Sequence, residues 1–346
     1  MKKLKHYLTA PGRRVRLYLD SAGKLGYTGF SKFRVALDIL WWRRVHHYKA
    51  DDYVFYEFDK YSPTYRKLFL RDYDQYITYG KLNYPSTVHG KAGQYEMLGK
   101  EVINREWIQI DKTDLKAAES FIKENKKVIF KPNVGSCGRG VFAFDIADGE
   151  KAMKEIILSV HGNDYICEQF IEQHEKLSAL HPQSVNSIRV LAFNDHGNIQ
   201  IIAATLKIGG DDKVVDNFRN EGLAANIDIE NGIVNTPLFD LNNSSTYFTK
   251  TGINIMGFKI PNWDKVCEIA KKSSLFRNGC VILGLDIAVT EDGAALIEFN
   301  NRPGTRIVQS FDKKPKGKLI RDYCKKYKKE LRKLPLRVKK AHKDVY

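Results

Sequence analysis

Three residues with oxygen-bearing side chains recur along one short stretch near the C-terminal end of the sequence. Asp286 lies in an apolar run before the turn signal Glu291-Asp292-Gly293, and Glu298 and Asn300 lie in the run after it, as in two strands joined by a tight turn. A turn centred on Asp292 places Asp286 opposite Glu298, at roughly 5 Å, where two carboxylates repel unless a cation lies between them. The spacing therefore predicts a Mg²⁺ site. The alternative is an ordinary hairpin whose acids are solvated or paired with an arginine.

A second stretch carries groups suited to binding phosphate. Lys131 ends a run of apolar residues, and glycines follow at 135, 138 and 140. Successive N–H groups of a glycine-rich loop can form a concave anion site, and a lysine adds a point charge. The loop is not a Walker A sequence, because no Gly-Lys-Ser/Thr follows and the next expected element is a strand. Taken alone, the stretch also fits a glycine-rich hairpin with an unrelated lysine.

The order of these motifs resembles the ATP-grasp superfamily, over roughly residues 85 to 312. The resemblance implies two α/β lobes that clamp ATP, with two Mg²⁺ ions on Asp286, Glu298 and Asn300, where Mn²⁺ is an acceptable substitute. It assigns Glu168 and the backbone that follows to adenine, and Glu175, or alternatively His174, to ribose. The complete set of nucleotide-binding residues that it implies is Lys91, Lys131, Gly135, Ser136, Gly138, Gly140, Glu168, Gln169, Phe170, Ile171, His174 and Glu175.

A closer likeness is to the sugar-transfer-associated ATP-grasp group, which is related to α-L-glutamate ligases. It rests on the segments 173–175, 180–190, 215–218 and 226–228. Two departures stand out: Glu221-Gly222 replaces a common Gly-Gly pair, and Gly284 stands where peptide ligases often carry an arginine. The resemblance leaves Arg189 and Arg302 as candidates to steady an acyl phosphate, although either could be a structural ion-pair partner. It makes Asn186, Asn217 and Arg219 candidates for the acceptor pocket.

The resemblance implies a carboxylate–amine ligase that forms an amide through an acyl phosphate, in the biosynthesis or modification of a bacterial surface polysaccharide such as a capsule. The expected partners are a small-molecule or glycan carboxylate and an amine. Two alternatives stay open, because some ATP-grasp proteins phosphorylate an acceptor, as a kinase does, and because a membrane-tethered protein can bind ATP without turnover.

Composition fits an enzyme with a substantial core. The chain has 346 residues, of which 43% are hydrophobic, and its five cysteines form no Cys-x-x-Cys pair, which favours a reducing cytoplasm. No apolar run approaches the ~20 residues of a membrane span, and the first residues lack a signal-peptide core. We therefore expect a cytoplasmic protein.

Positive charge is concentrated at the two ends. Residues 1–50 carry 12 Lys/Arg against 2 Asp/Glu, and residues 313–346 carry 15 against 3. Because the net charge of the whole chain is +16, the part between these ends is mildly acidic. Between Leu37 and Lys49, apolar residues interleave with arginines, as in an interfacial amphipathic helix. This pattern predicts peripheral contact with an anionic membrane at the inner face of the plasma membrane, and the alternative is a packing helix with a solvated basic edge. Nucleic acid is a less favoured partner, because no recognition motif accompanies the charge.

The sequence divides into four parts. Residues 1–85 form a basic, aromatic-rich helical region, residues 86–165 the first ATP-grasp lobe, residues 166–312 the second lobe, and residues 313–346 a lysine-rich helix and tail. We expect helices over 91–98, 114–124 and 150–160, and strands over 107–110, 165–171, 187–193 and 199–207. The loop at 209–212 is glycine-rich and suited to move over the site.

Overall fold

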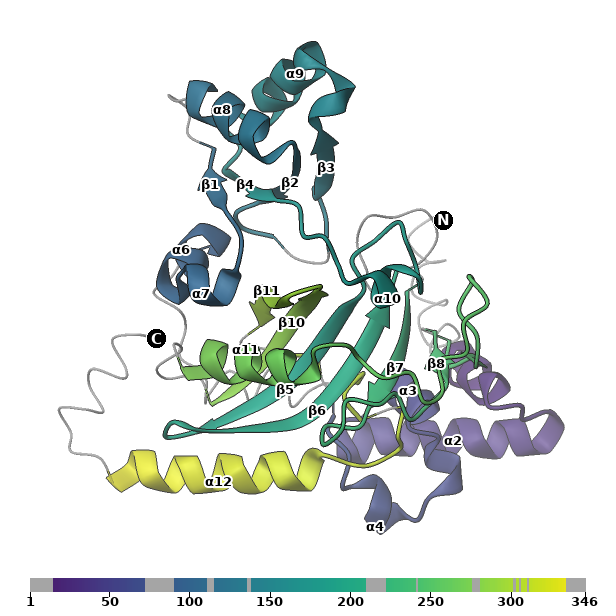
Figure 1. Ribbon diagram of the computed structural model, residues 1–346. Helices are drawn as coiled ribbons and strands as arrows, with labels where there is room; N and C mark the ends of the chain where they lie inside the picture. Colours follow the sequence, from purple (N-terminus) through teal and green to yellow (C-terminus); the bar gives the residue numbers. More distant parts are fainter. Residues whose placement is uncertain are drawn as a thin grey trace, which may run out of the picture.

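A computed structural model places two antiparallel sheets and their helices in one mixed α/β molecule (Figure 1). It describes residues 15–71, 90–110, 115–135, 138–209, 222–240, 242–275, 281–300, 303–304, 306–309 and 311–333. None of the helices in these ranges is long and apolar enough to cross a membrane.

The small sheet has the strand order β1-β4-β2-β3 and stands at the top of Figure 1. Helices α8 and α9 pack their apolar faces on it, so that Ile122, Phe130 and Ile157 share one core. The predicted helix over 150–160 is confirmed, and the other predictions here agree within about two residues. The elements are β1 (Trp107–Gln109), α8 (Leu115–Asn125), β2 (Lys127–Pro132), β3 (Phe142–Asp145), η3 (Ile146–Asp148), α9 (Glu150–Val160) and β4 (Tyr165–Gln169).

The boundary between the lobes lies later than predicted. A first lobe that ends at residue 165 would exclude β4, but β4 is the second strand of the small sheet and pairs with both β1 and β2. The small lobe therefore continues through Gln169. Two short helices before β1, α6 (Gly90–Leu98) and α7 (Lys100–Ile103), pack against the core of the large sheet.

The large sheet has the order β11-β10-β5-β6-β7-β8-β9. Alternating side chains give it two different faces. One face packs against α11 (Trp263–Leu275) in the main hydrophobic core, through residues such as Val190, Leu206 and Leu285. The strands are β5 (Ser187–Asp195), β6 (Asn198–Ile208), β7 (Leu223–Ile227), β8 (Leu238–Phe239), β9 (Ser245–Thr246), β10 (Ile282–Thr290) and β11 (Gly293–Asn300), and the short helix α10 (Glu175–Ser178) precedes them.

The opposite face of the large sheet is covered at one end by α12 (Gly317–Lys333), which runs along the bottom of Figure 1. Ile320 and Cys324 are buried there, and Tyr323 stacks on Phe193 with ring centroids 3.9 Å apart. The prediction of a C-terminal helix is thus confirmed, although the described helix starts at Gly317 and not at Lys313.

The described N-terminal residues are helical, as predicted, but they do not form a separate unit. Their aromatic core includes Trp42 and Phe58 and continues into Ala224 of β7 and Phe311. Buried Asp52 also forms an ion pair with Arg306, 3.1 Å away, so this region braces the loop that follows β11. The elements are a helical segment at 15–24, α2 (Gly29–His46), α3 (Ala50–Phe55), η1 (Phe58–Lys60) and α4 (Pro63–Arg66).

Candidate active site

The β10–β11 hairpin brings Asp286 directly opposite Glu298, as predicted. The route differs from the prediction, because Thr290 pairs with Gly293 and the turn therefore has two central residues, not three. Such a turn alone would pair Asp286 with Ile297. A β-bulge between Asp286 and Ile287 shifts the register by one residue, so that Glu298 and Asn300 face the same side as Asp286.

Asp286 lies at the centre of a polar row that crosses the large sheet. The row runs from Glu298 on β11 through Asp286 on β10, Arg189 on β5 and Thr205 on β6 to Asn226 on β7, each paired with the next. Because directly paired residues project to the same face, the row lies on the side of the sheet opposite α11, where Ser187 and Lys207 form a further buried polar pair. Polar groups held this way need partners when buried.

Asp286 has cationic partners within the protein. Arg189 donates two hydrogen bonds to its carboxylate, at 2.6 and 2.7 Å, and Nζ of Lys207 lies 3.4 Å from Oδ1. Burial by itself raises the pKa of Asp286, but the charges of Arg189 and Lys207 outweigh it and lower the pKa to about 2. The ion pair that the sequence left as an alternative therefore exists beside the expected metal ligands. Lys207 was not predicted, since nothing but its place on β6 marks it.

Charged residues of both lobes act on the carboxyl group of Glu298. Burial, followed by the charge of Asp286, raises its pKa, and the charges of Lys91, Arg189 and Lys131 oppose that rise. Two of these cations belong to the small lobe and its preceding helix, whereas the third belongs to the large sheet. The expected phosphate-binding and metal-binding residues are thus brought into electrostatic reach of one another.

The donors fit a hard cation. Glu298 and Asn300 project from the same face of β11, and the Asp286 carboxylate keeps lone pairs beyond those that Arg189 uses. Within the described ranges no group of three His, Cys, Asp or Glu side chains is close enough to hold a metal ion. The chemistry of the set, two carboxylates and an amide, is that of a Mg²⁺ site completed by phosphate oxygens and water.

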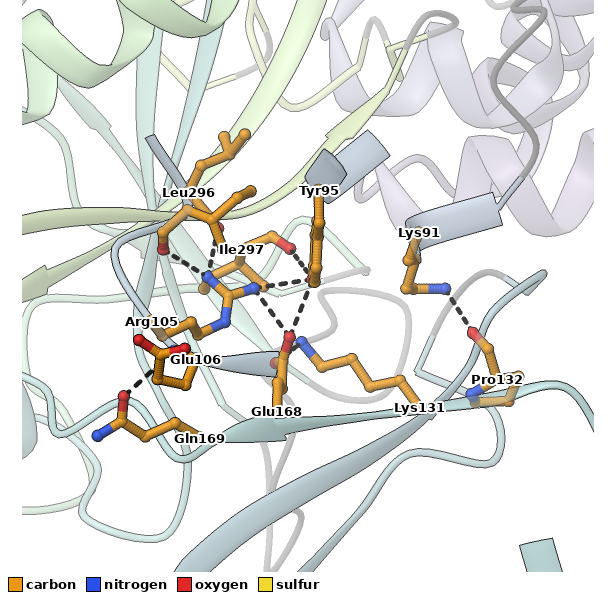
Figure 2. Close-up of polar contacts among 11 residues, drawn as sticks. Lys91, Tyr95, Arg105, Glu106, Lys131, Pro132, Glu168, Gln169, Leu296 and Ile297 are labelled. Carbon is orange, nitrogen blue, oxygen red and sulfur yellow. Dashed lines mark hydrogen bonds and ion pairs between the residues drawn. The ribbon is translucent and has the colours of Figure 1, made fainter. Parts of the chain in front are cut away.

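A buried ion network fixes Lys131. Glu168, which is 1% exposed, pairs with Lys131 through one oxygen and with Arg105 through the other, the latter at 2.9 Å, and Tyr95 donates to it at 3.0 Å (Figure 2). Burial tends to raise the pKa of Glu168, but Arg105 and Lys131 lower it overall. Burial lowers the pKa of Lys131 despite this partner. The carboxylate of Glu168 therefore faces two cations of the protein, and its expected contact with adenine stays a prediction.

Arg105 connects the same network to the β10–β11 hairpin, which carries the expected metal ligands and is called the metal hairpin below. It donates to the carbonyl of Leu296 at 2.7 Å, and Tyr95 donates to the carbonyl of Ile297 at 3.2 Å, so both bond the bulged part of β11 (Figure 2). Neither residue was predicted from the sequence. Both precede the first recognisable motif, and neither stands in a pattern typical of a binding site.

Two glycines of the loop adopt backbone conformations that suit glycine, and the expected phosphate site there stays a prediction. Gly138 and Gly140 have φ values of 67° and 72°, in the left-handed region. A Cβ at Gly140 would lie 2.8 Å from the hydroxyl of Tyr165, so no side chain fits there. Lys91 reaches this loop and donates to the carbonyl of Pro132 at 2.9 Å (Figure 2). Gly135 is described and unconstrained, whereas Ser136 lies outside the described residues.

The hinge after β4 leads from the small lobe to the metal hairpin. The N–H groups of Gln169 and Phe170 donate to Glu106 and Lys127 within the small lobe, at 2.9 and 3.1 Å, and Ile171 follows them. The backbone N–H of His174 then donates to Val289, and that of Glu175 donates to Glu291, at 2.8 and 2.6 Å. Val289 lies about 10 Å along β10 from Asp286. The expected ribose ligands, His174 and Glu175, are therefore bonded to the same hairpin that carries the expected metal ligands.

One acceptor-pocket prediction is wrong. Asn186 is 0% exposed, and its side chain donates to the carbonyls of Leu177 and His181 while its oxygen accepts from the N–H of Gly209. A side chain so fully used in the interior organises the segment before β5 and cannot line an open pocket. Asn217, Arg219 and Arg302 lie outside the described residues, as does most of the loop at 209–212.

The side chain of Arg189 lies beside Gly284, the position where peptide ligases often carry an arginine. A Cβ built at Gly284 would lie 3.7 Å from Nη1 of Arg189 and 2.6 Å from Cβ of Pro303. The guanidinium of the neighbouring strand thus fills the space beside Gly284, and a larger residue there would collide with Pro303. Arg189 therefore stays the candidate for the role of that arginine.

The ion pair of Asp286 predicts acid sensitivity. Because its pKa is about 2 in the folded protein and 3.8 ordinarily, the pair contributes on the order of 2 kcal/mol, fully present above pH 4 and lost between about pH 4 and 2. Urea unfolding at a series of pH values should therefore show the free-energy difference between wild type and Asp286→Asn shrinking by that amount as the pH falls. A difference that stays constant over this window would show that the pair does not stabilise the fold.

Comparison with known proteins gives the family. The family described as sugar-transfer associated ATP-grasp matches residues 94–315 of the 346. Similar solved structures include the ATP-grasp ligase PsnB complexed with a phosphomimetic variant of its minimal precursor, Mg and ADP (15% identity, TM-score 0.43, covering 71% of this chain and 62% of that chain). Another is D-alanine–D-alanine ligase from Bacillus anthracis (14% identity, TM-score 0.39, covering 64% of this chain and 59% of that chain). A third is L-amino acid ligase from Bacillus licheniformis (12% identity, TM-score 0.39, covering 64% of this chain and 43% of that chain).

The matched region spans less than two thirds of each of these structures. Functionally curated protein sequences give no significant match. The family match covers both lobes, from within α6 to the loop after β11. It includes Lys131, Arg189 and Asp286, which act on Glu298, whereas Lys91 lies three residues before it. With its mixed α/β fold, the chain belongs to the sugar-transfer associated ATP-grasp family.

Proposed function

We propose that this protein is an ATP-dependent carboxylate–amine ligase that forms an amide in bacterial surface-polysaccharide biosynthesis or modification. The observation that carries the proposal is the convergence of Lys91 and Lys131 with Asp286, Arg189 and Glu298 at the junction of the two lobes. A lone structural ion pair would not need two further lysines, one from α6 and one from the small sheet. Phosphoryl transfer does need such a cluster, because its demands are positioning and charge neutralisation.

The small lobe would hold the phosphates of ATP. Lys131 and Lys91 supply positive charge, and the left-handed glycines at 138 and 140 leave the loop backbone open to close approach. Glu168 and Arg105 act on Lys131 and set its position. Since the N–H groups of Gln169 and Phe170 are already bonded, base recognition is proposed for the backbone at Ile171, with Glu175 or His174 at the ribose.

Asp286, Glu298 and Asn300 would hold Mg²⁺, with Mn²⁺ as an acceptable substitute. When bound, the metal offsets charge on the phosphates and orients them. The raised pKa of Glu298 means that metal binding must displace a proton more often than at an ordinary glutamate, so metal affinity should fall in acid.

The reaction would proceed in two balanced steps. A carboxylate oxygen of the substrate attacks the γ-phosphorus, and the bond from that phosphorus to the leaving oxygen of ADP breaks, giving an acyl phosphate. The amine nitrogen then attacks the acyl carbon, the C–O bond to phosphate breaks, and the nitrogen loses a proton. Arg189 is the proposed group that steadies the acyl phosphate, because its guanidinium lies beside Gly284 and against Asp286.

The test uses a panel of uronic-acid sugars and amino acids, offered singly and in pairs with Mg-ATP, with ADP and phosphate release as the readout. Release that requires both a carboxylate and an amine supports the ligase. A substrate whose carboxylate carries ¹⁸O must then transfer one ¹⁸O to the released phosphate. A phosphorylated hydroxyl acceptor, formed without an amine, would replace the proposal with a kinase.

A further inference from the structure

Helix α2 is apolar on two opposite sides. Val35, Ala36, Ile39 and Trp42 are buried in the N-terminal aromatic core. A surface helix of a globular protein normally presents polar residues on the side opposite its core-facing stripe. α2 does not.

The other side of α2 carries six large apolar side chains that are exposed. Phe30 is 83% exposed, and the remaining five are between 40% and 51% exposed. They recur three or four residues apart and therefore share one face of the helix. We call this face the outer stripe of α2, and it consists of Phe30, Phe33, Leu37, Leu40, Trp41 and Val45.

The cations that lie beside the outer stripe are Arg34 and Arg44, which are exposed and stand three or four residues from its members. The helix contains one acid, Asp38. Asp38 is neutralised, because Arg66 donates to it at 2.6 Å and Tyr53 also donates to the same oxygen. The stripe is thus an exposed apolar surface bordered by cations with no free anion on the helix.

We propose that the outer stripe of α2 lies in the interface of an anionic lipid membrane. A helix with large apolar side chains on one face and Lys or Arg beside them has the chemistry of an in-plane interfacial helix. Trp41 suits the headgroup level, because its ring is amphipathic. A second copy of this chain fits less well, since a symmetric contact would bring the arginines of both copies together.

The position of α2 links this surface to the active-site side of the molecule. Its inner side shares a core with Phe311, and Asp52 of the next helix pairs with Arg306. Both partners belong to the loop that follows β11. Membrane contact would therefore act on a helix whose inner side packs against the loop after β11. Resting on the proposed function, this contact would bring the enzyme to membrane-attached glycan.

Flotation with vesicles of phosphatidylcholine alone, and of phosphatidylcholine with phosphatidylglycerol, tests the proposal on the full chain. Binding should require the anionic lipid and weaken as salt is added. Vesicles of brominated lipid should quench Trp41, which is 48% exposed, whereas Trp42 and Trp263 are buried. Trp41→Phe should remove most of that quenching. Equal binding to both vesicle types, or none to either, would overturn the proposal.

Substitutions distinguish binding through the outer stripe from nonspecific adsorption of the protein to vesicles. Phe33→Ser with Leu37→Ser should lower vesicle affinity by at least tenfold, and Arg34→Gln with Arg44→Gln by about 25-fold, at about fivefold per arginine. The matched control is Leu158→Ser on α9 in the small lobe, which replaces a leucine that is 62% exposed, against 49% for Leu37. An effect of Leu158→Ser as large as that of the stripe, or a stripe-dependent dimer in light scattering without vesicle binding, would contradict the assignment.

Discussion

Glu298→Gln is expected to lower ATP turnover by about 10²–10³-fold, the range for removal of one group that stabilises charge in the transition state. The same variant is expected to be more stable than wild type at neutral pH when metal is absent. Burial and Asp286 raise the pKa of Glu298, so the folded protein favours the neutral side chain. That preference stabilises the fold below the ordinary pKa of 4.5 and is lost as pH rises through the folded pKa. Glutamine keeps the neutral form at every pH.

Urea unfolding and ADP release together measure both effects. The stability advantage of Glu298→Gln over wild type should disappear in acid, and added Mg²⁺ should stabilise wild type far more than the variant. Asp292→Asn, in the exposed turn of the same hairpin, is the matched control and should change neither quantity. A variant that is both inactive and less stable at neutral pH would point to misfolding, and one with unchanged turnover would remove Glu298 from the metal site.

The sequence predicted the pairing of Asp286 with Glu298 correctly, but for an incomplete reason. A three-residue turn and a two-residue turn followed by a bulge give the same final register. The sequence distinguishes these two turns poorly, because residues 294–297 are all apolar and so show no alternation that would locate the bulge. The apolar positions shift from Ala294 and Leu296 to Phe299 on the core face, and that break in the period of two is the one signal available.

Residues that act through long-range contacts escaped prediction. Arg105 meets Glu168 and Leu296, which lie 63 and 191 residues further along the chain. Asn186 became a candidate for the acceptor pocket through the family resemblance, yet its amide is used entirely inside. In both cases tertiary packing decides the role, and local pattern does not report it.

Arg105→Met is expected to cost about 3–5 kcal/mol of unfolding free energy, the range for removing one partner of a buried ion pair. The guanidinium bonds Glu168, Tyr95 and the carbonyls of Ile103 and Leu296, and its side chain is 2% exposed. Methionine fills a similar volume but leaves the buried Glu168 with Lys131 as its remaining cation. Urea unfolding should show a lower midpoint with an unchanged slope.

Lys100→Met supplies the matched control. Lys100 forms an ion pair with Glu106, the residue after Arg105, at 2.7 Å, but this pair is in solvent, with side chains 79% and 55% exposed. Exposed pairs contribute about 1 kcal/mol or less, so this variant should unfold almost as wild type does. A cost for Arg105→Met no larger than for Lys100→Met would mean that water already satisfies Glu168. A large cost would mean that Glu168, the buried partner of Lys131, depends on Arg105. Because Arg105 also bonds the carbonyl of Leu296, the support of Lys131 and the support of β11 would then rest on one side chain.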